Sequence, residues 1–349
     1  MAYRLTIATL ASAAPMGAQV YEEEIARRAP AVLPEAEVRR TVVRSLRSEL
    51  PGTVRLPARV LGDAPAAVRR ATGRLIYPRG LVHRMGLSLP PAPGPEVITI
   101  HDTVAWRFPD EGRPEPHAAR EARRAAAVVS VSRFSADDVA ERLGLDHVDA
   151  VHNGVDARFV DAEPLPVAER RALGIERPYV LHAGGSSLRK NLDGLAEAWA
   201  LVHDAVGDVD LVLSGPPSAR RDALFGPLPR TVRVGRVPSA QVPGLVAGAR
   251  AVVVPSLYEG FGLPALEAMA CGVPVVAADR SSLPEVCGDA ALLVEPDADG
   301  LGAGLVAVLR DEAPVAAMVR RGRERAARFT WEASADAHAR IWRRVLATG

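Results

Sequence analysis

The chain has 349 residues, of which 48% are hydrophobic and 24% charged, and its formal net charge is +1 at pH 7. This composition is typical of a soluble globular protein, the length favours two domains, and the charge provides no general attraction to nucleic acid. No apolar run reaches 18 residues, so the sequence predicts no transmembrane helix. The two cysteines, Cys271 and Cys287, are too few for a disulfide framework or a metal cluster, and we expect small buried side chains in a cytoplasmic protein.

The first forty-three residues predict a βαβ beginning. Residues 4–10 favour a buried strand over a secretion signal, because the apolar stretch is short and only Arg4 precedes it. A loop of small residues over 11–17 and a helix over 18–29 follow, and residues 37–43 predict a second strand. There is no G-x-G-x-x-G after the first strand, so a dinucleotide site is not supported.

Arginine dominates the next segment, residues 38–84, which carries eleven arginines against Glu49 and Asp63. One interpretation is a solvated arginine-rich face. The other is contact with an anionic acceptor or peripheral contact with a membrane surface.

Buried strands are expected at 81–83, 97–101 and 127–131. His101 and Asp102 end the second of these, and carboxyl ends of strands face the ligand crevice in open α/β sheets. His101 could equally hydrogen-bond a loop carbonyl, and the nearby Trp106 and Phe108 could line an acceptor pocket or simply pack.

Helix and connector signals follow. Residues 135–138, Ser-Ala-Asp-Asp, resemble a capping box, and Gly144 ends that helix. Residues 157–178 are polar, contain Pro164 and Pro166, and predict the connector between two domains.

A second strand and loop begin at Tyr179. Residues 180–182 predict a strand, and Gly184 and Gly185 open a loop whose N–H groups could face a phosphate. Lys190, where the loop meets a helix, is the only lysine beside forty-two arginines. It indicates a place where a compact ammonium is needed, unless it is a chance survivor on a solvated helix. The pattern is not a Walker A motif.

The most informative stretch is residues 251–288, which predicts strand, loop, helix and strand. Residues 251–254 form a buried strand, Pro264 opens a helix that Gly272 ends, and 273–277 form the next strand. Glu259 lies in the loop and Glu267 in the first turn of the helix. Free N–H groups there would suit an anion and the carboxylates would suit hydroxyls, as in a nucleotide sugar. The alternative is a plain βαβ turn with a Glu that stabilises the helix.

Strands alternate with helices through the rest of the chain. The expected strands are 210–214, 231–234 and 291–294, and the expected helices are 241–249, 299–310, 314–329 and 331–345. Two doubly wound α/β domains facing a cleft are the consistent fold class.

These motifs resemble the retaining glycosyltransferases of family four, which have the GT-B arrangement of two Rossmann-like domains. Glu259 and Glu267 match the Glu-x7-Glu signature within EGFGLPALE, and EAMACGVPVVA, LPEVCGDAALLVEP, HNGVD and GGSSLRKN match in order and spacing. The resemblance is strong over the second half. It is weaker over the first half, where the Gly17 loop, His101-Asp102 and SVSRFSADD carry it.

The resemblance implies a role for each matching residue. Residues 1–160 would form an acceptor-binding domain on which 331–349 packs back, and 161–330 would bind the nucleotide sugar. Glu267 would accept hydrogen bonds from the ribose, and Glu259 would hold sugar hydroxyls together with the backbone of Phe261, Gly262 and Leu263. Lys190 would neutralise the diphosphate, Gly17 would approach that diphosphate, and His101 would lie near the donor sugar.

One position departs from the family pattern. Many members have an arginine where this chain has Gly185. Arg189 could replace it, although neighbouring residues of a helix lie on different faces. Members with a small residue there and Arg-Lys-Asn often transfer mannose or a similar hexose.

The resemblance implies metal-independent transfer of a hexosyl unit from a GDP- or UDP-hexose to an acceptor hydroxyl, with the anomeric configuration retained. There is no D-x-D run, and Lys190 would take the place of a metal cation. The acceptor could be a glycan, a lipid-linked sugar or a small molecule. Alternatives on the same fold are a nucleotide-sugar epimerase and a non-catalytic nucleotide-sugar-binding member.

Overall fold

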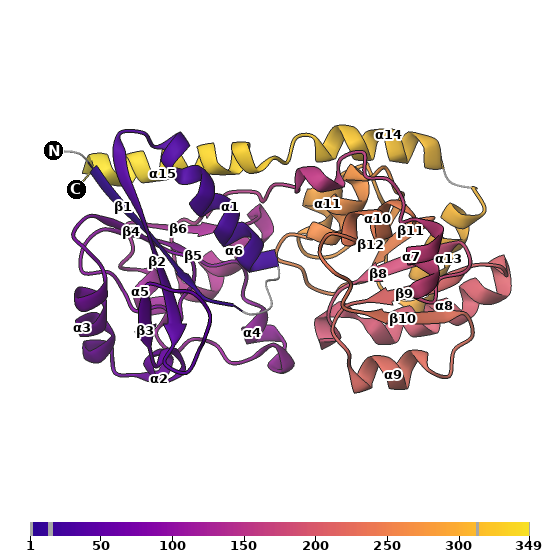
Figure 1. Cartoon of the computed structure of the whole chain (residues 1–349), viewed down its shortest axis with the longest axis horizontal. Coiled ribbons are helices and arrows are strands. Elements are labelled where there is room, and N and C mark those ends of the chain that lie inside the picture. The colour runs from indigo at the N-terminus through magenta and orange to yellow at the C-terminus, as the bar shows by residue number, and fades with distance from the viewer. Residues whose placement is uncertain (1–2, 13–16, 312–313, 349) are drawn as a thin grey trace. The chain divides into compact units, whose positions relative to one another are not determined.

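The computed structural model describes residues 3–12, 17–311 and 314–348. The chain divides into two compact units, which we call unit 1 (within residues 1–154 and 331–349) and unit 2 (residues 155–330) (Figure 1). The expected α/β class, with two Rossmann-like domains, is confirmed. The boundary falls before Val155, whose backbone N–H donates to the carbonyl of Phe329, so residues 155–160 belong to unit 2.

Unit 1 is built on a seven-stranded parallel sheet with the order β3-β2-β1-β4-β5-β6-β7. Its strands are β1 (Tyr3–Leu10), β2 (Ala36–Ser45), β3 (Val54–Leu56), β4 (Leu81–Arg84), β5 (Glu96–Thr99), β6 (Ala127–Ser130) and β7 (Asp149–Ala150). β4, β5 and β6 are buried over their whole length, as expected for strands covered by helices on both faces.

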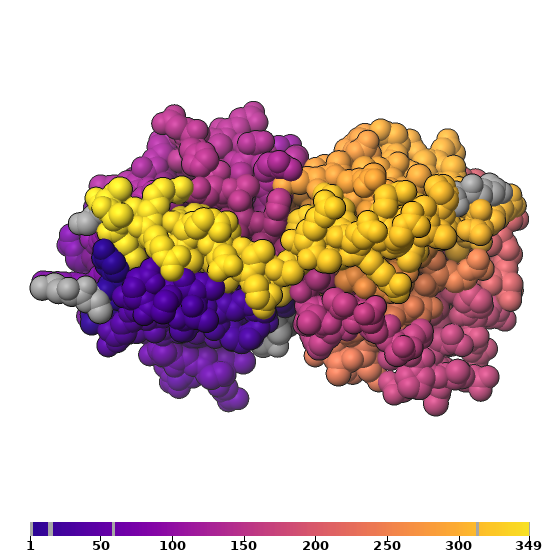
Figure 2. All heavy atoms as spheres, turned by 90° about the horizontal axis from the view of Figure 1, so that it is seen from above, coloured from indigo at the N-terminus to yellow at the C-terminus, as the bar shows by residue number. Residues whose placement is uncertain are grey.

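Helices and turns surround this sheet. They are α1 (Gly17–Val32), α2 (Ala58–Asp63), α3 (Ala66–Ile76), α4 (Val104–Arg107), η1 (Pro109–Glu111), α5 (Ala118–Ala122), α6 (Arg133–Leu143) and α15 (Trp331–Thr348). The C-terminal α15 packs on α1 and β4, and Figure 2 shows it in yellow along the indigo α1. The predicted loop at 11–17 lies partly outside the described residues, and Gly17 is the first residue of α1.

The arginine-rich segment is more structured than its sequence indicates. It holds β3, α2 and α3, none of which was predicted. Arg69 and Arg84 are 1% and 0% exposed and form ion pairs with Glu121, and Arg84 also pairs with Glu96. The solvated-face interpretation is therefore wrong for these two arginines, because partners distant in sequence neutralise them inside the unit.

Unit 2 contains a six-stranded parallel sheet with the order β10-β9-β8-β11-β12-β13. Its strands are β8 (Tyr179–Ala183), β9 (Asp210–Ser214), β10 (Thr231–Gly235), β11 (Ala251–Val254), β12 (Val275–Ala278) and β13 (Leu292–Val294). The helices and turns are η2 (Ala157–Phe159), α7 (Val167–Ala172), η3 (Leu188–Lys190), α8 (Leu192–Val206), α9 (Ala219–Phe225), α10 (Val242–Ala247), α11 (Leu263–Ala270), α12 (Leu283–Cys287), α13 (Ala298–Leu309) and α14 (Val315–Ala326). Trp199 of α8 is fully buried in a core shared with α13 and the central strands.

Two helix starts differ from expectation. The N-cap of α6 is Ser132, whose side chain accepts from the N–H of Ser135, so the helix begins before the predicted Ser135. α11 begins at Leu263, with Pro264 as its second residue. Gly144 and Gly272 have φ of +63° and +72°, as their positions just after helices require.

Candidate functional site

Two loops of unit 2 follow neighbouring strands at the centre of its sheet. β8 and β11 pair in parallel, with Val252 beside Leu181. The strand order runs from β8 to β10 on one side and from β11 to β13 on the other. The gap between the two strands is therefore a topological switch point, where open α/β sheets bind their ligands. The loops at its carboxyl edge carry Lys190 and Glu259.

The loop after β8 is anchored by Asn191, which has φ of +51° and caps α8. Its side-chain amide donates to the carbonyls of Pro255 and Pro296, at 3.1 and 2.6 Å. Gly185 has no atom within 4 Å of where a Cβ would lie, so no steric reason requires glycine there. At Gly184 a Cβ would make only ordinary contacts.

The loop after β11 turns sharply into α11 at Gly262. Its φ is +104°, and a Cβ would lie 2.8 Å from the side chain of Leu283, so only glycine fits. The N–H groups of Gly262 and Leu263 precede the intrahelical hydrogen bonds. The side chain of Phe261 is buried and packs edge-on against Phe329, at 5.8 Å between ring centroids, so only its backbone could meet a ligand.

Glu259 joins the two loops through a buried ion cluster. Its Oε1 accepts from Lys190 Nζ at 2.6 Å and from Ser256 Oγ at 2.7 Å, and its Oε2 accepts from an Arg189 terminal nitrogen at 2.9 Å. Burial alone would raise the pKa of Glu259, but the charges of Lys190 and Arg189 and the hydrogen bonds lower it to about 2. The cluster of two cations and one carboxylate has a net charge of +1, which favours an anionic ligand.

Arg189 and Lys190 act on the same residue, contrary to the expectation that sequence neighbours point apart. They lie in the short 3₁₀ turn η3 and not in an α-helix. The two oxygens of one carboxylate take one cation each, so divergent side chains still meet it.

The backbone of Glu259 is held by two serines that the sequence did not single out. Its N–H donates to Ser281 Oγ and its carbonyl accepts from Ser282 Oγ, both at 2.9 Å. Ser281 has φ of +55°, a conformation that non-glycine residues rarely adopt. Of the three serines that contact Glu259, only Ser256 could have been found from the sequence, because it lies three residues before Glu259 in the same loop.

Glu267 lies in the second turn of α11, and not in the first turn where the sequence placed it. Its half-buried carboxylate has no hydrogen-bond or ion-pair partner among the described residues. Burial and the nearby charge of Asp156 raise the pKa of Glu267 to about 8, and Arg158 opposes this effect. The sequence did not predict that Asp156 and Arg158 lie near Glu267, although the HNGVD motif that contains Asp156 matches the family pattern.

A buried histidine beneath these loops was also missed. His182 on β8 is 2% exposed; its Nδ1 lies 3.3 Å from the Val253 carbonyl, and its Nε2 has no hydrogen-bond partner among the described residues. Burial, and next the charge of Lys190, lower the pKa of His182 to about 4, so the ring is neutral at pH 7. A histidine inside an otherwise apolar strand was the available signal.

In unit 1, His101 lies two residues beyond β5. Its Nε2 is buried and has no hydrogen-bond partner in the part of the chain that the structure describes, and its ring packs edge-on against Tyr21, at 4.9 Å between centroids. Burial, followed by His338, lowers the pKa of His101 to about 4. The alternative of a hydrogen bond from His101 to a loop carbonyl is not found among the described residues. Trp106 packs against the core formed by α5, α6 and their strands.

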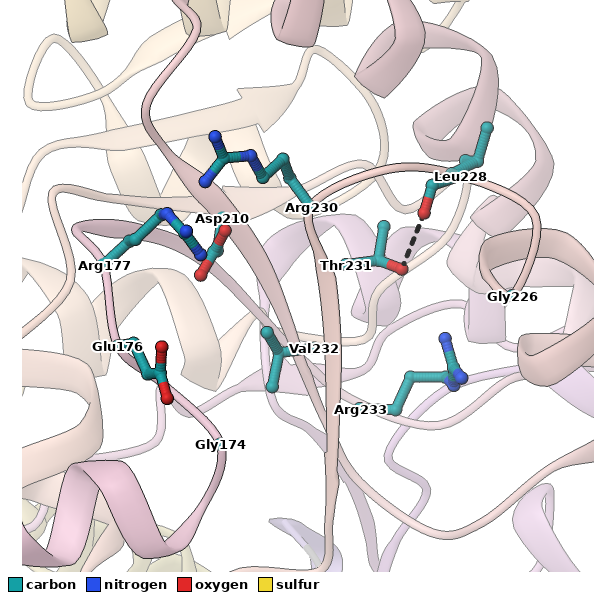
Figure 3. Close-up of a pocket in the computed structure, with 10 residues that line it drawn as sticks. All are labelled: Gly174, Glu176, Arg177, Asp210, Gly226, Leu228, Arg230, Thr231, Val232 and Arg233. Carbon is teal, nitrogen blue, oxygen red and sulfur yellow. Dashed lines mark hydrogen bonds between the residues drawn. The ribbon is translucent and has the colours of Figure 1, made fainter.

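A cavity of about 340 Å³ in unit 2 contains none of the predicted site residues. Figure 3 shows its lining, with Glu176 and Arg177 on the segment before β8, Asp210 at the start of β9, and Arg230 and Arg233 around β10. It lies at the amino ends of strands, whereas Lys190 and Glu259 follow carboxyl ends.

Two features of the described residues bear on the classes of ligand. No group of three or more His, Cys, Asp or Glu is placed to hold a metal ion. No described helix is both long and apolar enough to cross a membrane.

Comparison with known proteins agrees with the motifs. A model of glycosyltransferase family 4 matches residues 22–159, and a model of group 1 glycosyl transferases matches 177–311. The O-antigen chain mannosyltransferase B of Escherichia coli is 32% identical over 283 residues, covering 76% of this chain and 74% of that protein.

Solved structures show the same fold. Sucrose-phosphate synthase from Thermosynechococcus elongatus has a TM-score of 0.76 at 22% identity, covering 99% of this chain and 100% of that one. HepE from Anabaena, solved with UDP and glucose, has a TM-score of 0.73 at 21% identity, with 98% of both chains covered. The fold is GT-B, and the chain belongs to the group 1 and family 4 glycosyltransferases.

Proposed function

We propose that this glycosyltransferase moves a hexosyl unit from a nucleoside diphosphate sugar to an acceptor hydroxyl with retention of anomeric configuration. The observation that carries the proposal is the Lys190–Glu259–Arg189 cluster at the switch point of unit 2. A net positive, buried cluster beside the start of α11 suits a diphosphate whose charge grows as the sugar leaves.

In this proposal Lys190 contacts the diphosphate, and Arg189 contributes a second positive charge beside it. The loop glycines Gly184 and Gly185 let the diphosphate approach the backbone closely. The lysine takes the role that a metal ion has in other transferases, so we propose that no metal is required.

Glu259 serves as a holder of sugar hydroxyls and not as a nucleophile. Both of its oxygens already accept hydrogen bonds, and a carboxylate with a pKa of about 2 is a weak base and a weak nucleophile. The backbone of Phe261, Gly262 and Leu263 completes this hydroxyl-binding turn. The acceptor then attacks from the face that the leaving group occupies, and a phosphate oxygen takes its proton.

Glu267 has a different task, which is to accept hydrogen bonds from the ribose hydroxyls. Its carboxylate is half-buried and has no partner among the described residues, so a ligand can engage it without breaking an ion pair. This is the main difference between the two carboxylates. It also explains why they do not form the acid–base pair of a glycoside hydrolase.

A GDP-mannose donor is the first to test, because the Escherichia coli relative is named as a mannosyltransferase. UDP-glucose is the second, because HepE was solved with UDP and glucose. We propose an acceptor-binding role for unit 1 and a cytoplasmic location.

The experiment is a thermal-shift screen with GDP, UDP and their hexoses, followed by transfer assays with the stabilising donor and a panel of sugar and lipid-linked acceptors. The proposal would be supported if nucleoside diphosphate is released only when acceptor is present and a chelator does not change that release. It also requires that the anomeric proton of the product be axial or equatorial as it is in the donor. Isomerised sugar without acceptor would instead indicate an epimerase, and binding without turnover a non-catalytic protein.

We also propose peripheral contact with an anionic membrane through α3. Val68 and Leu75 are 49% and 84% exposed and lie seven residues apart, on one face of the helix. Arg70 and Arg74 are exposed, and neither pairs with an acidic group among the described residues. Exposed apolar side chains beside arginines are typical of helices that lie on anionic lipid.

A further inference from the structure

The C-terminal helix α15 is joined to the interior of unit 1 by a chain of buried hydrogen bonds. Tyr21 of α1 is fully buried, and its hydroxyl lies 2.9 Å from Thr99 Oγ1 and 2.7 Å from Nε2 of His338 on α15. His83 Nε2 also lies 2.9 Å from Thr99 Oγ1, and Trp342 of α15 donates to His83 Nδ1 at 3.1 Å.

With neutral histidines, only one arrangement of protons satisfies all of these bonds, and it uses the single Thr99 hydroxyl hydrogen for Tyr21, although that oxygen also lies 3.8 Å from Met85 Sδ. The indole N–H of Trp342 can only donate, so His83 Nδ1 accepts and its Nε2–H donates to Thr99. At the other end, His338 Nδ1 lies 2.8 Å from the carbonyl oxygen of Ser334, which can only accept.

His338 Nδ1 therefore carries the proton, and its Nε2 must accept from the Tyr21 hydroxyl. The Tyr21 oxygen in turn accepts from Thr99. Burial lowers the pKa of both His83 and His338, which agrees with the neutral state that this arrangement requires. Tyr21 is thus held on two sides, by β5 and by α15.

The ring of Tyr21 packs against the ring of His101. The two rings meet edge-on at 81° with 4.9 Å between centroids, and no hydrogen bond holds the His101 ring among the described residues. Tyr21 is fixed by hydrogen bonds, whereas among the described residues the His101 ring has no hydrogen-bond partner and packs against Tyr21. The position of the His101 imidazole therefore depends on the position of the Tyr21 ring.

We propose that Tyr21 and His338 are positioning residues for His101, so that the C-terminal helix takes part in building the donor-sugar side of unit 1. The proposal rests on the proposed function for its catalytic consequence, since the family resemblance implies that His101 lies near the donor sugar. The contact itself stands on geometry within unit 1 alone.

The test compares variants that release or keep the Tyr21 ring. Tyr21→Phe removes both hydrogen bonds but keeps the ring, and His338→Leu removes the bond from α15. His338→Gln is the conservative rescue, because its amide can accept from Tyr21 and donate to the Ser334 carbonyl. Tyr77→Phe is the matched control: Tyr77 is a buried tyrosine of the same unit whose hydroxyl has no hydrogen-bond partner within residues 3–12, 17–311 and 314–348.

The first readout is the NMR spectrum of chain labelled in its eight histidines, with the His101 signal assigned through His101→Gln. Tyr21→Phe and His338→Leu are expected to shift or broaden the His101 imidazole signals, whereas His338→Gln and Tyr77→Phe leave them in place. Unmoved signals in the first pair, or equal movement in Tyr77→Phe, would overturn the proposal.

The second readout separates kcat from KM with the donor that the wild type uses. We expect Tyr21→Phe and His338→Leu to lower kcat roughly threefold to tenfold with little change in acceptor KM. Shifted spectra with unchanged kcat would also overturn the proposal. A wild type that is inactive with every donor would count against the proposed function, while the spectra alone would still decide the contact.

Discussion

Lys190 Nζ lies 2.6 Å from Glu259 Oε1, although 69 positions separate the two residues in the chain. They meet because β8 and β11 are neighbours in the sheet, and each residue lies in the loop that follows its strand. The pair converts two loop residues into one charged site.

Replacing Lys190 should mainly reduce turnover. Lys190→Ala removes the cation proposed to meet the diphosphate, and we expect a loss of roughly 10²–10³ in kcat, as for an oxyanion-hole donor. Lys190→Arg should retain part of the activity, because it keeps the charge but not the compact ammonium. Steady-state kinetics of the two variants check this, and near-normal kcat for Lys190→Ala would exclude the phosphate role.

Nucleotide binding should depend on pH through Glu267. Its pKa of about 8 means that the carboxyl group of the free protein is mostly protonated at pH 7, whereas the ribose-bound form is expected to be ionised. Below pH 8, each unit by which the pH is raised should therefore increase nucleotide affinity by up to about tenfold. Binding in this range should release close to one proton. Calorimetry in two buffers of different ionisation enthalpy measures that proton.

The matched variant for this prediction is Glu267→Gln. It should bind the nucleotide more weakly and without proton release. A wild-type affinity that does not change between pH 6.5 and 8 would contradict the assigned ionisation of Glu267.

The buried His338 should make unit 1 sensitive to acid. Its folded pKa of about 4 lies below the ordinary value of 6.5, so the unfolded chain binds more protons between these limits. The stability that the neutral ring contributes is complete above pH 6.5 and is lost as the pH falls toward 4. The advantage of the wild type over His338→Gln in unfolding free energy should shrink by about 2 kcal/mol between pH 7.5 and 5.0.

Urea unfolding at the two pH values measures this difference, and comparison with His338→Gln cancels the opposite effect of Glu22 and Glu267, whose raised pKa values favour folding at lower pH. An advantage that stays constant across the range would show that His338 does not titrate as described.

The buried arginines of unit 1 should be sensitive to loss of their partner. Glu121→Ala leaves Arg69 and Arg84 without their shared carboxylate, and we expect about 3–5 kcal/mol of destabilisation. The exposed pair of Glu35 and Arg343 provides the control, since Glu35→Ala should leave the urea midpoint almost unchanged. Equal midpoints for the two variants would argue against the buried network.

Membrane binding should depend on α3. Leu75→Ser combined with Arg74→Glu should reduce sedimentation with vesicles that contain anionic phosphatidylglycerol, while neutral phosphatidylcholine vesicles bind neither protein. The kinetics with a soluble acceptor should not change. If wild type and variant sediment alike, α3 is not the contact surface.

The alternation of strands and helices could be followed in sequence because buried parallel strands are short apolar runs bounded by glycine, proline and polar residues. β1, β8, β9 and β11 were found within a few residues. Helix α3 and strand β3 were missed because arginines mask their pattern. Arg69 counts as polar in any sequence pattern, yet it is fully buried because Glu121, 52 positions away, neutralises it.

The sequence by itself determined the family, through Glu259, Glu267, the single lysine and their spacing, because loops that face phosphates and hydroxyls need particular residues at particular positions. Only the tertiary structure decided that Arg189 and Lys190 share Glu259, and that the C-terminal helix holds Tyr21 against His101. Those contacts depend on which strands become neighbours and on where α15 packs. Both are set by the burial of the whole hydrophobic core, and no local stretch of residues determines either of them.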